Sequence, residues 1–380
     1  MAENLGALVD QASQSGVNSC IFGFRRESSF FRELFFHGRE LRVYRSTHEL
    51  KAHFRARVPS AVFLQSPYSH HYPSWFVRAT RSQPLAYAGY GIPLSRWTDG
   101  HFRQKLILAA TWLLAESQYS FEGFSEATPA ARVLLTGDPL MWNVRKELAP
   151  GEPLARGSTA LLWAPHWSQS WPTGERGFGR WRETLGPLTS WVQKNPGVSV
   201  TIRPHPILRE ALSLVGEEKT FHPEAGQALN AHIDASNLRR LHSLLEHENV
   251  KLSTKTLVKD VVESDALLTD GVSPIAYWAP TGKPLAVVRD EFSPSFNLNG
   301  THIVACARQV SSCSGIIEWL DDWEKGHFSN NEEIARRSEE VHPSFQDSPF
   351  SLWLKEFNRE TGGSPLEKRV PPIEGNAQDA

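Results

Sequence analysis

Four polar turns in the second half of the chain contain the residues best suited to chemistry. Each lies beside a short apolar run typical of a β-strand: Ala164-Pro165-His166-Trp167, Arg203-Pro204-His205-Pro206, Thr269-Asp270-Gly271-Val272-Ser273-Pro274 and Thr281-Gly282-Lys283-Pro284. Imidazole, guanidinium, ammonium and hydroxyl groups, together with free backbone N–H groups, are the groups that bind phosphate oxygens. Their recurrence at successive strand ends indicates a site for a nucleotide diphosphate.

The turn from Thr269 to Pro274 is the strongest candidate for a phosphate loop. Gly271 allows a tight turn and a close approach of the backbone. Ser273 is expected to cap a helix, and Pro274 suits its first position. The N-terminus of such a helix attracts anions. We therefore expect Thr269, Asp270, Gly271 and Ser273 to bind the phosphates, although a plain capped helix would also explain Ser273 and Pro274.

The other three turns supply candidate cations and histidines. The two prolines beside His205 fix its backbone, and Arg203 together with His205 is able to neutralise a diphosphate. His166 is expected to project into a cleft. Each histidine has an alternative as an incidental residue of a surface loop. Lys283 fits a phosphate contact and a helix cap equally well.

Strands that alternate with helices predict the fold. In the second half we expect strands at 160–164, 198–202, 250–252, 266–268 and 285–288, with helices between them. In the first half we expect strands at 17–24, 41–44, 61–64, 85–88 and 132–136, a helix at 28–36 and a long amphipathic helix at 101–118. This pattern predicts an α/β protein with two doubly wound, Rossmann-like domains facing across a cleft, and with ligands beyond the carboxyl ends of the strands.

Composition places the domain boundaries. A segment rich in charge, Pro and Gly at 141–158 separates a domain at 1–150 from a nucleotide-diphosphate-binding domain at 151–330. Residues 331–360 are expected to form C-terminal helices, and 361–380 a flexible tail.

The overall charge and the cysteines exclude several classes of protein. The 380 residues carry a net charge of -2, so no global field favours nucleic acid. Three cysteines without metal-ligand spacing argue against a structural metal site, and no motif for a cofactor occurs. No signal peptide or membrane span is predicted, which favours a cytoplasmic protein. Arg25, Arg26 and Arg32 lie among phenylalanines, a mixture that suits either peripheral membrane contact or an ordinary amphipathic helix.

The order of these motifs resembles the CDP-glycerol glycerophosphotransferase family, the enzymes related to teichoic acid primases and polymerases. The resemblance rests on "LLWAPHW", "VTIRPHPIL", "SDALLTDGVSPIAYWAPTGKP" and "FNLNG" in the second half, and on "AYAGYGIPL" and "LLTGDP" in the first. It covers about residues 60–320 and is more specific in the second half.

The resemblance implies a GT-B fold and transfer of glycerol phosphate, or a related polyol phosphate, from a CDP-linked donor. The acceptor would be a hydroxyl of a lipid-linked or surface polymer at the inner face of the membrane. His205, Thr269 and Ser273 would contact the donor diphosphate, and His166 and Arg203 would border it. Tyr90 stands where members of the family have the histidine regarded as the catalytic base. His166 is then the remaining candidate for that base in the cleft.

Two other functions fit the same sequence. A GT-B glycosyltransferase using a nucleotide sugar would share the diphosphate site. A non-catalytic partner in surface polysaccharide synthesis is the third possibility. It is favoured by Tyr90 and by Tyr277, which stands where the family has an acidic residue.

Overall fold

The computed structural model describes residues 2–23, 39, 41–44, 46–56, 59–69, 72, 74–80, 83–89, 91–148, 159–168, 177–213, 235–328 and 332–362. The chain divides into two compact units. Unit 1 comprises Met1–Gly91, Gly100–Trp142 and Ser344–Ala380, and unit 2 comprises Ile92–Asp99 and Asn143–Pro343. Four predictions fall outside the described residues: the helix at 28–36, the arginine- and phenylalanine-rich segment, the role of Tyr90, and the tail beyond 362.

Unit 2 is built on a six-stranded parallel sheet with the order β12-β11-β10-β7-β8-β9. The strands are β7 (Ala160–Ala164), β8 (Ser199–Ile202), β9 (Val250–Leu252), β10 (Ala266–Thr269), β11 (Leu285–Val288) and β12 (Arg308–Val310). The chain fills one side of the sheet with β8 and β9, and then returns to place β10 on the other side of β7. This is the doubly wound Rossmann order, and its topological switch point lies between β7 and β10.

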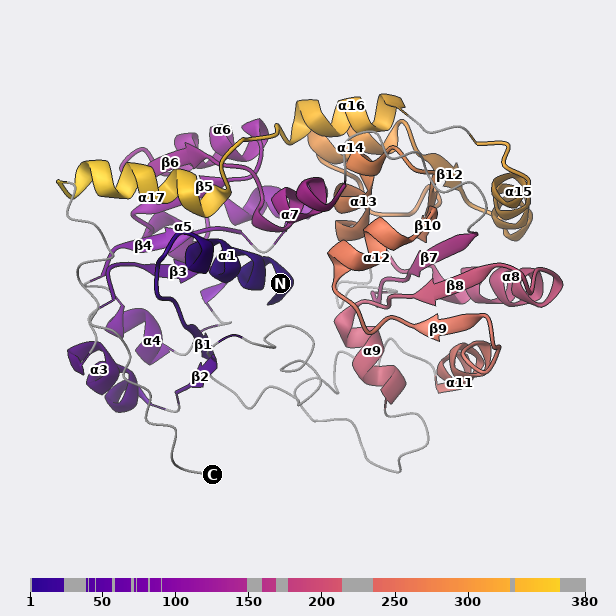
Figure 1. Ribbon diagram of the computed structural model, residues 1–380, viewed down its shortest axis with the longest axis horizontal. Coiled ribbons are helices and arrows are strands. Elements are labelled where there is room, and N and C mark those ends of the chain that lie inside the picture. The colour runs from indigo at the N-terminus through magenta and orange to yellow at the C-terminus, as the bar shows by residue number, and fades with distance from the viewer. Residues whose placement is uncertain are drawn as a thin grey trace. The chain divides into compact units, whose positions relative to one another are not determined.

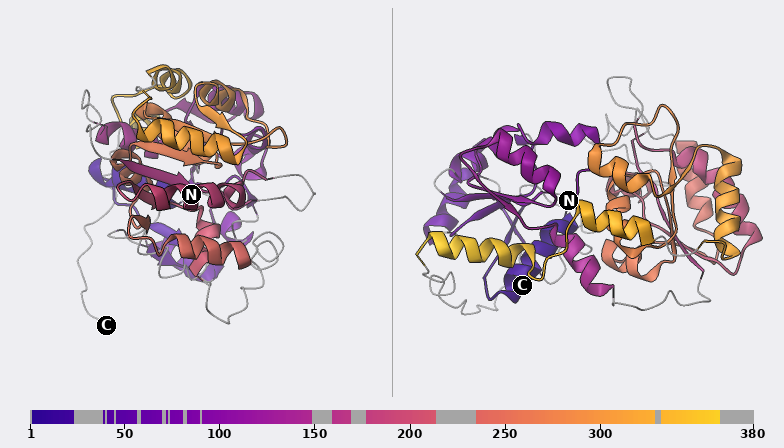
Figure 2. Two further views of the ribbon diagram at one scale, coloured as in Figure 1. Left: turned by 90° about the vertical axis from the view of Figure 1, so that its right-hand side faces the viewer. Right: turned by 90° about the horizontal axis from the view of Figure 1, so that it is seen from above.

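Helices cover both faces of this sheet (Figure 1), so its central strands β7 and β10 are buried along almost their whole length. One face carries α8 (Trp181–Lys194), α9 (Pro206–Ser213), α11 (Ala235–Leu244) and α15 (Cys313–Glu324), whose apolar side chains form one core with the strands. Figure 2 (left) looks onto α15, α8 and α11, which lie one beside another. The other face carries α12 (Leu257–Glu263), α13 (Ser273–Trp278), η3 (Ala279–Thr281), α14 (Leu298–Val304) and α16 (Glu332–Val341).

Unit 1 has a four-stranded parallel sheet with the order β3-β4-β5-β6, and a separate parallel pair β1-β2. These strands are β1 (Ile21–Gly23), β2 (Leu41–Val43), β3 (Val62–Leu64), β4 (Leu85–Tyr87), β5 (Trp112–Ala115) and β6 (Arg132–Leu135). One face of the larger sheet packs on α1 (Ala2–Gln14) and α17 (Pro349–Glu360). The other packs on α3 (Thr47–Ala56), α4 (Ser74–Ala79), α5 (Lys105–Leu108) and α6 (Gln118–Ala127). Two parallel α/β units confirm the predicted fold class.

The long helix predicted over 101–118 is wrong. The end of η2 (Arg96–His101), the short helix α5, the strand β5 and the first residue of α6 occupy this stretch. All four residues of β5 are buried, since helices cover both faces of the sheet. A strand buried on both faces shows no alternation of polar and apolar residues, so its sequence resembles part of a buried helix.

The C-terminal helices belong to different units. α16 packs against α14 and η3 of unit 2. α17 packs against α1 and places Phe350, Trp353 and Phe357 in the core of unit 1. α7 (Pro139–Glu147) spans the point where the chain passes from unit 1 to unit 2.

A short strap, residues 92–99, leaves the first half of the sequence and is built into unit 2. Ser95 forms an antiparallel bridge with Phe296. The backbone N–H of Asn297 donates to the carbonyl of Leu94 at 2.8 Å, and its side-chain amide donates to the carbonyl of Pro93 at 2.9 Å. Leu94 is fully buried. The "FNLNG" segment therefore binds the main chain of the strap through its own backbone and through the side chain of Asn297.

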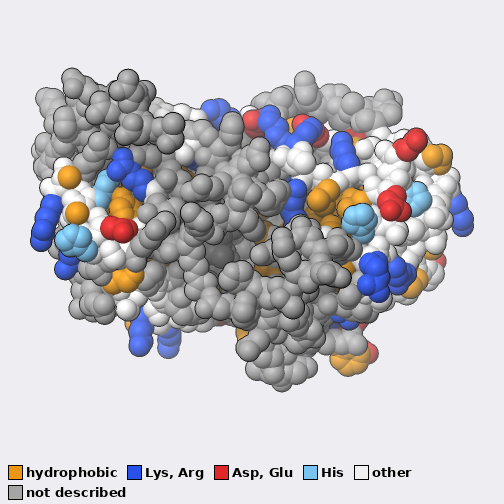
Figure 3. Space-filling view, turned by 90° about the horizontal axis from the view of Figure 1, so that it is seen from below, with side chains coloured by type: hydrophobic (Ala, Val, Ile, Leu, Met, Phe, Trp, Pro, Cys, Tyr) orange, Lys and Arg blue, Asp and Glu red, His pale blue; other side chains and the backbone are white. Residues whose placement is uncertain are grey.

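Among the described residues, no helix is both long enough and apolar enough to cross a membrane. On the face seen in Figure 3, the described Lys and Arg side chains lie in separate groups among acidic and apolar ones.

The strap predicts that Gly300→Ala destabilises the protein. A Cβ at this position would lie 2.2 Å from the carbonyl oxygen of Leu94. To relieve this contact, the backbone of Gly300 or of Leu94 would have to move. We expect a loss of about 1–3 kcal/mol in the free energy of unfolding, which outweighs the usual helical gain of about 1 kcal/mol from Gly to Ala. Urea unfolding measures it. Gly197→Ala is the control, because nothing lies within 4 Å of its Cβ. Equal stability of Gly300→Ala and wild type would contradict this packing.

Candidate functional site

The carboxyl ends of β7 and β10 form the centre of the candidate site. Ala164 is paired with Thr269 at the ends of the two strands, so the turns that follow them start side by side. β8 lies on the other side of β7 and delivers the turn that contains His205. The structure therefore brings together three of the four predicted turns at the switch point, where doubly wound sheets bind ligands.

Thr269 and Gly271 form the framework of the predicted phosphate loop. The Thr269 hydroxyl donates to the carbonyl of Ala164 at 2.7 Å and accepts the N–H of Gly271 at 2.9 Å. Thr269 is fully buried. A Cβ on Gly271 would meet its nearest neighbour at 3.4 Å, so only modest shifts would admit a side chain there. Thr269 joins the two strand ends rather than presenting its hydroxyl to solvent.

The prediction that Ser273 caps the helix is wrong. α13 begins at Ser273, and the residue before it, Val272, is already helical with φ -90° and ψ -53°. No side chain caps this helix start. Because it is not used as a cap, the exposed Ser273 side chain stays available at the edge of the site.

His166 and His205 form a pair, with ring centroids 4.8 Å apart. The backbone N–H of His205 donates to the carbonyl of Pro165 at 2.9 Å, which joins the two turns. Phe178 and Trp167 also lie near the His166 ring, at centroid distances of 5.8 and 6.1 Å. The two prolines beside His205 and the turn that joins it to Pro165 fix the position of the pair.

In both histidines, a backbone N–H two residues further along the chain fixes the same tautomer. The N–H of Ser168 donates to Nδ1 of His166 at 3.2 Å, and the N–H of Ile207 donates to Nδ1 of His205 at 3.3 Å. The Ser168 hydroxyl lies 2.8 Å from the same Nδ1 of His166. A backbone N–H is only a donor, so each Nδ1 is the acceptor and each Nε2 carries the proton. The pair thus presents two N–H donors.

Burial keeps both rings uncharged. It lowers the pKa of His166 to about 4. Burial also lowers the pKa of His205 well below its usual range, and the neighbouring His166 contributes further. A neutral imidazole with its Nδ1 engaged donates from Nε2 and does not accept a proton there. The predicted role of His166 as a base would require the other tautomer.

Asp270 contacts the backbone of His166, one member of the pair. Its carboxylate accepts the backbone N–H of His166 at 2.6 Å and the backbone N–H of Arg180. Burial raises the pKa of Asp270 to about 7, against the lowering effect of these two hydrogen bonds. Both carboxylate oxygens are thus directed at the protein backbone.

Arg203 and Lys283 do not join the group. The Arg203 guanidinium forms a 2.7 Å ion pair with the buried Asp260 and also donates to the carbonyl of Lys255. The Lys283 ammonium donates to three carbonyls at the end of α12, those of Val261, Val262 and Ser264. Lys283 precedes β11 and so lies at the opposite edge of the parallel sheet. Lys283 thus caps a helix, but this helix is α12 and not the helix directly before Lys283 that the sequence suggested.

Tyr277, at the position that is acidic in the resembling family, is buried in α13. Among the residues that the structure describes, no cluster of three His, Cys, Asp or Glu side chains is arranged to hold a metal ion.

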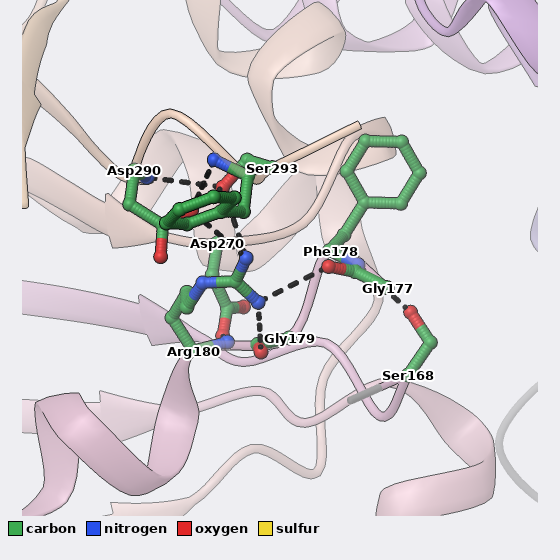
Figure 4. Close-up of polar contacts among 9 residues, drawn as sticks. Ser168, Gly177, Phe178, Gly179, Arg180, Asp270, Asp290 and Ser293 are labelled. Atoms are coloured by element: carbon green, nitrogen blue, oxygen red, sulfur yellow. Dashed lines mark hydrogen bonds and ion pairs between the residues drawn. The ribbon is translucent and has the colours of Figure 1, made fainter. Parts of the chain in front are cut away.

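Sequence reasoning missed four residues of the site: Ser168, Arg180, Asp290 and Ser293. Arg180 is buried, and its side chain links the turns after β7 and β11 (Figure 4). The one sequence signal was the pair of glycines, Gly177 and Gly179, just before it. Glycines there allow the close approach of chains that the structure shows.

No protein-family model matches the sequence, and no curated protein of known function matches it. Solved structures do share its fold. The UDP-GlcNAc 2-epimerase from Neisseria meningitidis, solved with UDP-GlcNAc, has a TM-score of 0.54 at 13% identity and covers 94% of this chain and 96% of its own. MnaA of S. aureus, solved with UDP, has a TM-score of 0.55 at 11% identity, covering 95% and 94%. The wall teichoic acid polymerase TagF has a TM-score of 0.55 at 13% identity, covering 97% and 94%. Identities this low establish the shared fold alone.

The geometry predicts the NMR behaviour of the two histidines. With ¹⁵N-labelled histidine, His166 and His205 should remain neutral and protonated at Nε2 down to pH about 5, well below the ordinary histidine pKa of about 6.5. The exposed His242 on α11 supplies a reference signal from a histidine outside the site. Titration of His166 near pH 6.5, or a proton on its Nδ1, would contradict the assigned tautomer.

Proposed function

We propose that the protein is a nucleotide-diphosphate-dependent transferase whose donor diphosphate is bound by the Nε2–H groups of His166 and His205. The observation that carries this proposal is the pair itself: two neutral imidazoles, 4.8 Å apart, each with Nδ1 held by a backbone N–H. The pair lies beside the switch point of a doubly wound sheet, the usual ligand position in this fold.

A diphosphate matches this arrangement because it offers several oxygens to donors that are already oriented. Hydrogen bonds to charged acceptors are stronger than those between neutral groups. The exposed Ser273 hydroxyl lies at the same strand ends and adds a donor. Asp270 is 4% exposed and both its oxygens accept backbone N–H groups, so in the proposal it does not contact the donor.

The nature of the donor follows from the motifs and the shared fold together. The motifs around His166, His205 and Ser273 resemble enzymes that use CDP-glycerol. One protein of the same fold is a teichoic acid polymerase, and two others were solved with UDP or UDP-GlcNAc. We therefore propose a CDP-linked polyol phosphate as donor and a hydroxyl of a surface polymer or lipid-linked acceptor as its partner.

In this reaction the acceptor oxygen attacks the distal phosphorus of the donor. A new P–O bond forms, the bond from that phosphorus to the bridging oxygen breaks, and CMP leaves with the bridging oxygen and its electron pair. The acceptor hydroxyl releases its proton to solvent water. Negative charge develops on the leaving and non-bridging oxygens, where donors fixed in advance stabilise it. His166 and His205 act as such donors.

A second function has a specific observation in its favour. Because a protein of the same fold binds UDP-GlcNAc, transfer of a sugar from a nucleotide sugar would use the same diphosphate site. The two reactions differ in the bond that breaks. Phosphate transfer releases the nucleoside monophosphate, whereas sugar transfer releases the diphosphate.

Donor binding tests the site directly. CDP, CDP-glycerol, CDP-ribitol, UDP and UDP-GlcNAc are titrated by calorimetry, and bound ligands should raise the melting temperature. Replacing His166 or His205 by alanine should weaken binding between about 10-fold and 100-fold, because a hydrogen bond to a charged group contributes roughly 1.5–3 kcal/mol. His242→Ala, an exposed position on α11, is the control. Wild-type affinity in both site variants would refute the proposal.

The released nucleotide identifies the reaction. With CDP-glycerol and a polyol-phosphate primer, we expect CMP as the product. UDP released from UDP-GlcNAc would establish sugar transfer instead. Binding without release from any donor would favour the non-catalytic partner.

A further inference from the structure

A polar network contacts the backbone of His166 and connects the turns after β7, β10 and β11. Its first member is Asp270, which is 4% exposed. One carboxylate oxygen accepts the backbone N–H of His166 at 2.6 Å, and the other accepts the backbone N–H of Arg180. His166 follows β7, and Arg180 immediately precedes α8. A single buried carboxylate thus fixes both ends of the β7–α8 connection at the end of β10.

Arg180 is the second member, and its guanidinium binds in two directions (Figure 4). One terminal nitrogen, Nη1, donates to the carbonyls of Gly177 and Gly179 at 3.1 and 2.9 Å. The other, Nη2, donates to Asp290 at 3.1 Å and to the Ser293 hydroxyl at 3.2 Å. Because the side chain of Arg180 is only 6% exposed, these protein groups take the place of water around its charge.

The segment held by Arg180 in turn holds the ring of His166. The N–H of Phe178 donates to the Ser168 hydroxyl at 3.1 Å, and the N–H of Gly179 donates to the Ser168 carbonyl at 2.5 Å. That hydroxyl lies 2.8 Å from Nδ1 of His166. The fit is close, since a Cβ on Gly177 would lie 2.4 Å from the Ser168 carbonyl oxygen. Asp270 thus holds the backbone of His166, and Arg180 supports the group that orients its ring.

The third branch reaches the turn after β11. Asp290 accepts the N–H of Phe292 at 3.0 Å, and its own N–H donates to the Ser293 hydroxyl at 3.0 Å. Burial tends to raise the pKa of Asp290, but the hydrogen bond and charge of Arg180 outweigh it and lower that pKa. Asp290 therefore remains the anionic partner of the buried guanidinium.

We propose that Arg180 and Asp270 are positioning residues, which set the orientation of the His166 N–H donor without touching the ligand. The sequence placed Asp270 among the phosphate ligands, but both its oxygens are engaged by backbone N–H groups. Arginine and aspartate suit this task because each binds two groups at once in a fixed geometry. That a nucleotide contacts this N–H group rests on the proposed function, whereas the orientation of His166 does not depend on any ligand.

Two conservative substitutions test the proposal. In Asp270→Asn the amide keeps one acceptor oxygen but turns an N–H₂ group toward a backbone N–H. In Arg180→Lys a single ammonium replaces a planar fork with donors on two sides. Asp322→Asn and Arg239→Lys, at exposed positions on α15 and α11, are the matched controls.

The first readout needs no ligand. In ¹⁵N-histidine spectra of the free protein, both site variants should shift the His166 resonances and allow its Nδ1 to be protonated, while His242 is unchanged. The second readout is CDP affinity by calorimetry, which should fall about tenfold or more, as expected when a binding group is misplaced by a fraction of an ångström. Both controls should leave the His166 resonances and the CDP affinity as in wild type.

Unchanged His166 resonances in folded Asp270→Asn overturn the proposal. If CDP affinity nevertheless falls, Asp270 contacts the ligand itself. Should Arg180→Lys fail to fold, Ser293→Ala removes one acceptor of Arg180 and should still broaden or shift the His166 signals. If wild type binds no nucleotide, the proposed function fails, and the spectra alone decide whether Asp270 and Arg180 position His166.

Discussion

The candidate site depends on one buried carboxylate, that of Asp270, which accepts two backbone N–H groups across the switch point of the unit 2 sheet. Burial of a charged carboxylate is unfavourable, and the pKa of Asp270, raised to about 7, reflects that penalty. The N–H groups of His166 and Arg180 offset part of it. These two hydrogen bonds connect the turn after β7 and the start of α8 to the end of β10. The position of His166 follows from this connection, as does that of Arg180.

The two histidines keep their Nε2–H groups as hydrogen-bond donors without carrying a positive charge. Each Nδ1 is occupied by the N–H two residues further along, so each Nε2–H is left to donate. The pKa of each imidazole is far below its usual value, and the rings stay neutral at physiological pH. The cations that the sequence suggested for this site, Arg203 and Lys283, have other partners. Recognition in this account therefore rests on oriented neutral donors and on the protein groups that orient them.

Much of the fold could be predicted from the sequence, because alternating apolar runs and polar turns define doubly wound sheets. Apolar runs predicted five of the six strands of unit 2. The edge strand β12 was not predicted, because two of its three residues are polar and exposed. The helix predicted at 101–118 is wrong because a strand buried on both faces has no periodicity that distinguishes it from a buried helix. Ser273 was misjudged because Val272 already adopts helical dihedral angles. Arg180 was missed because its partners, Asp270, Asp290 and Ser293, are 90 or more residues away in the chain.

The most direct test of the account is the response of the two Nε2–H groups to a bound nucleotide. In a ¹⁵N-histidine spectrum recorded with CDP, we expect the Nε2–H signals of His166 and His205 to shift together and to show scalar coupling to ³¹P across the hydrogen bonds. Binding of CDP that leaves both signals unchanged would contradict it.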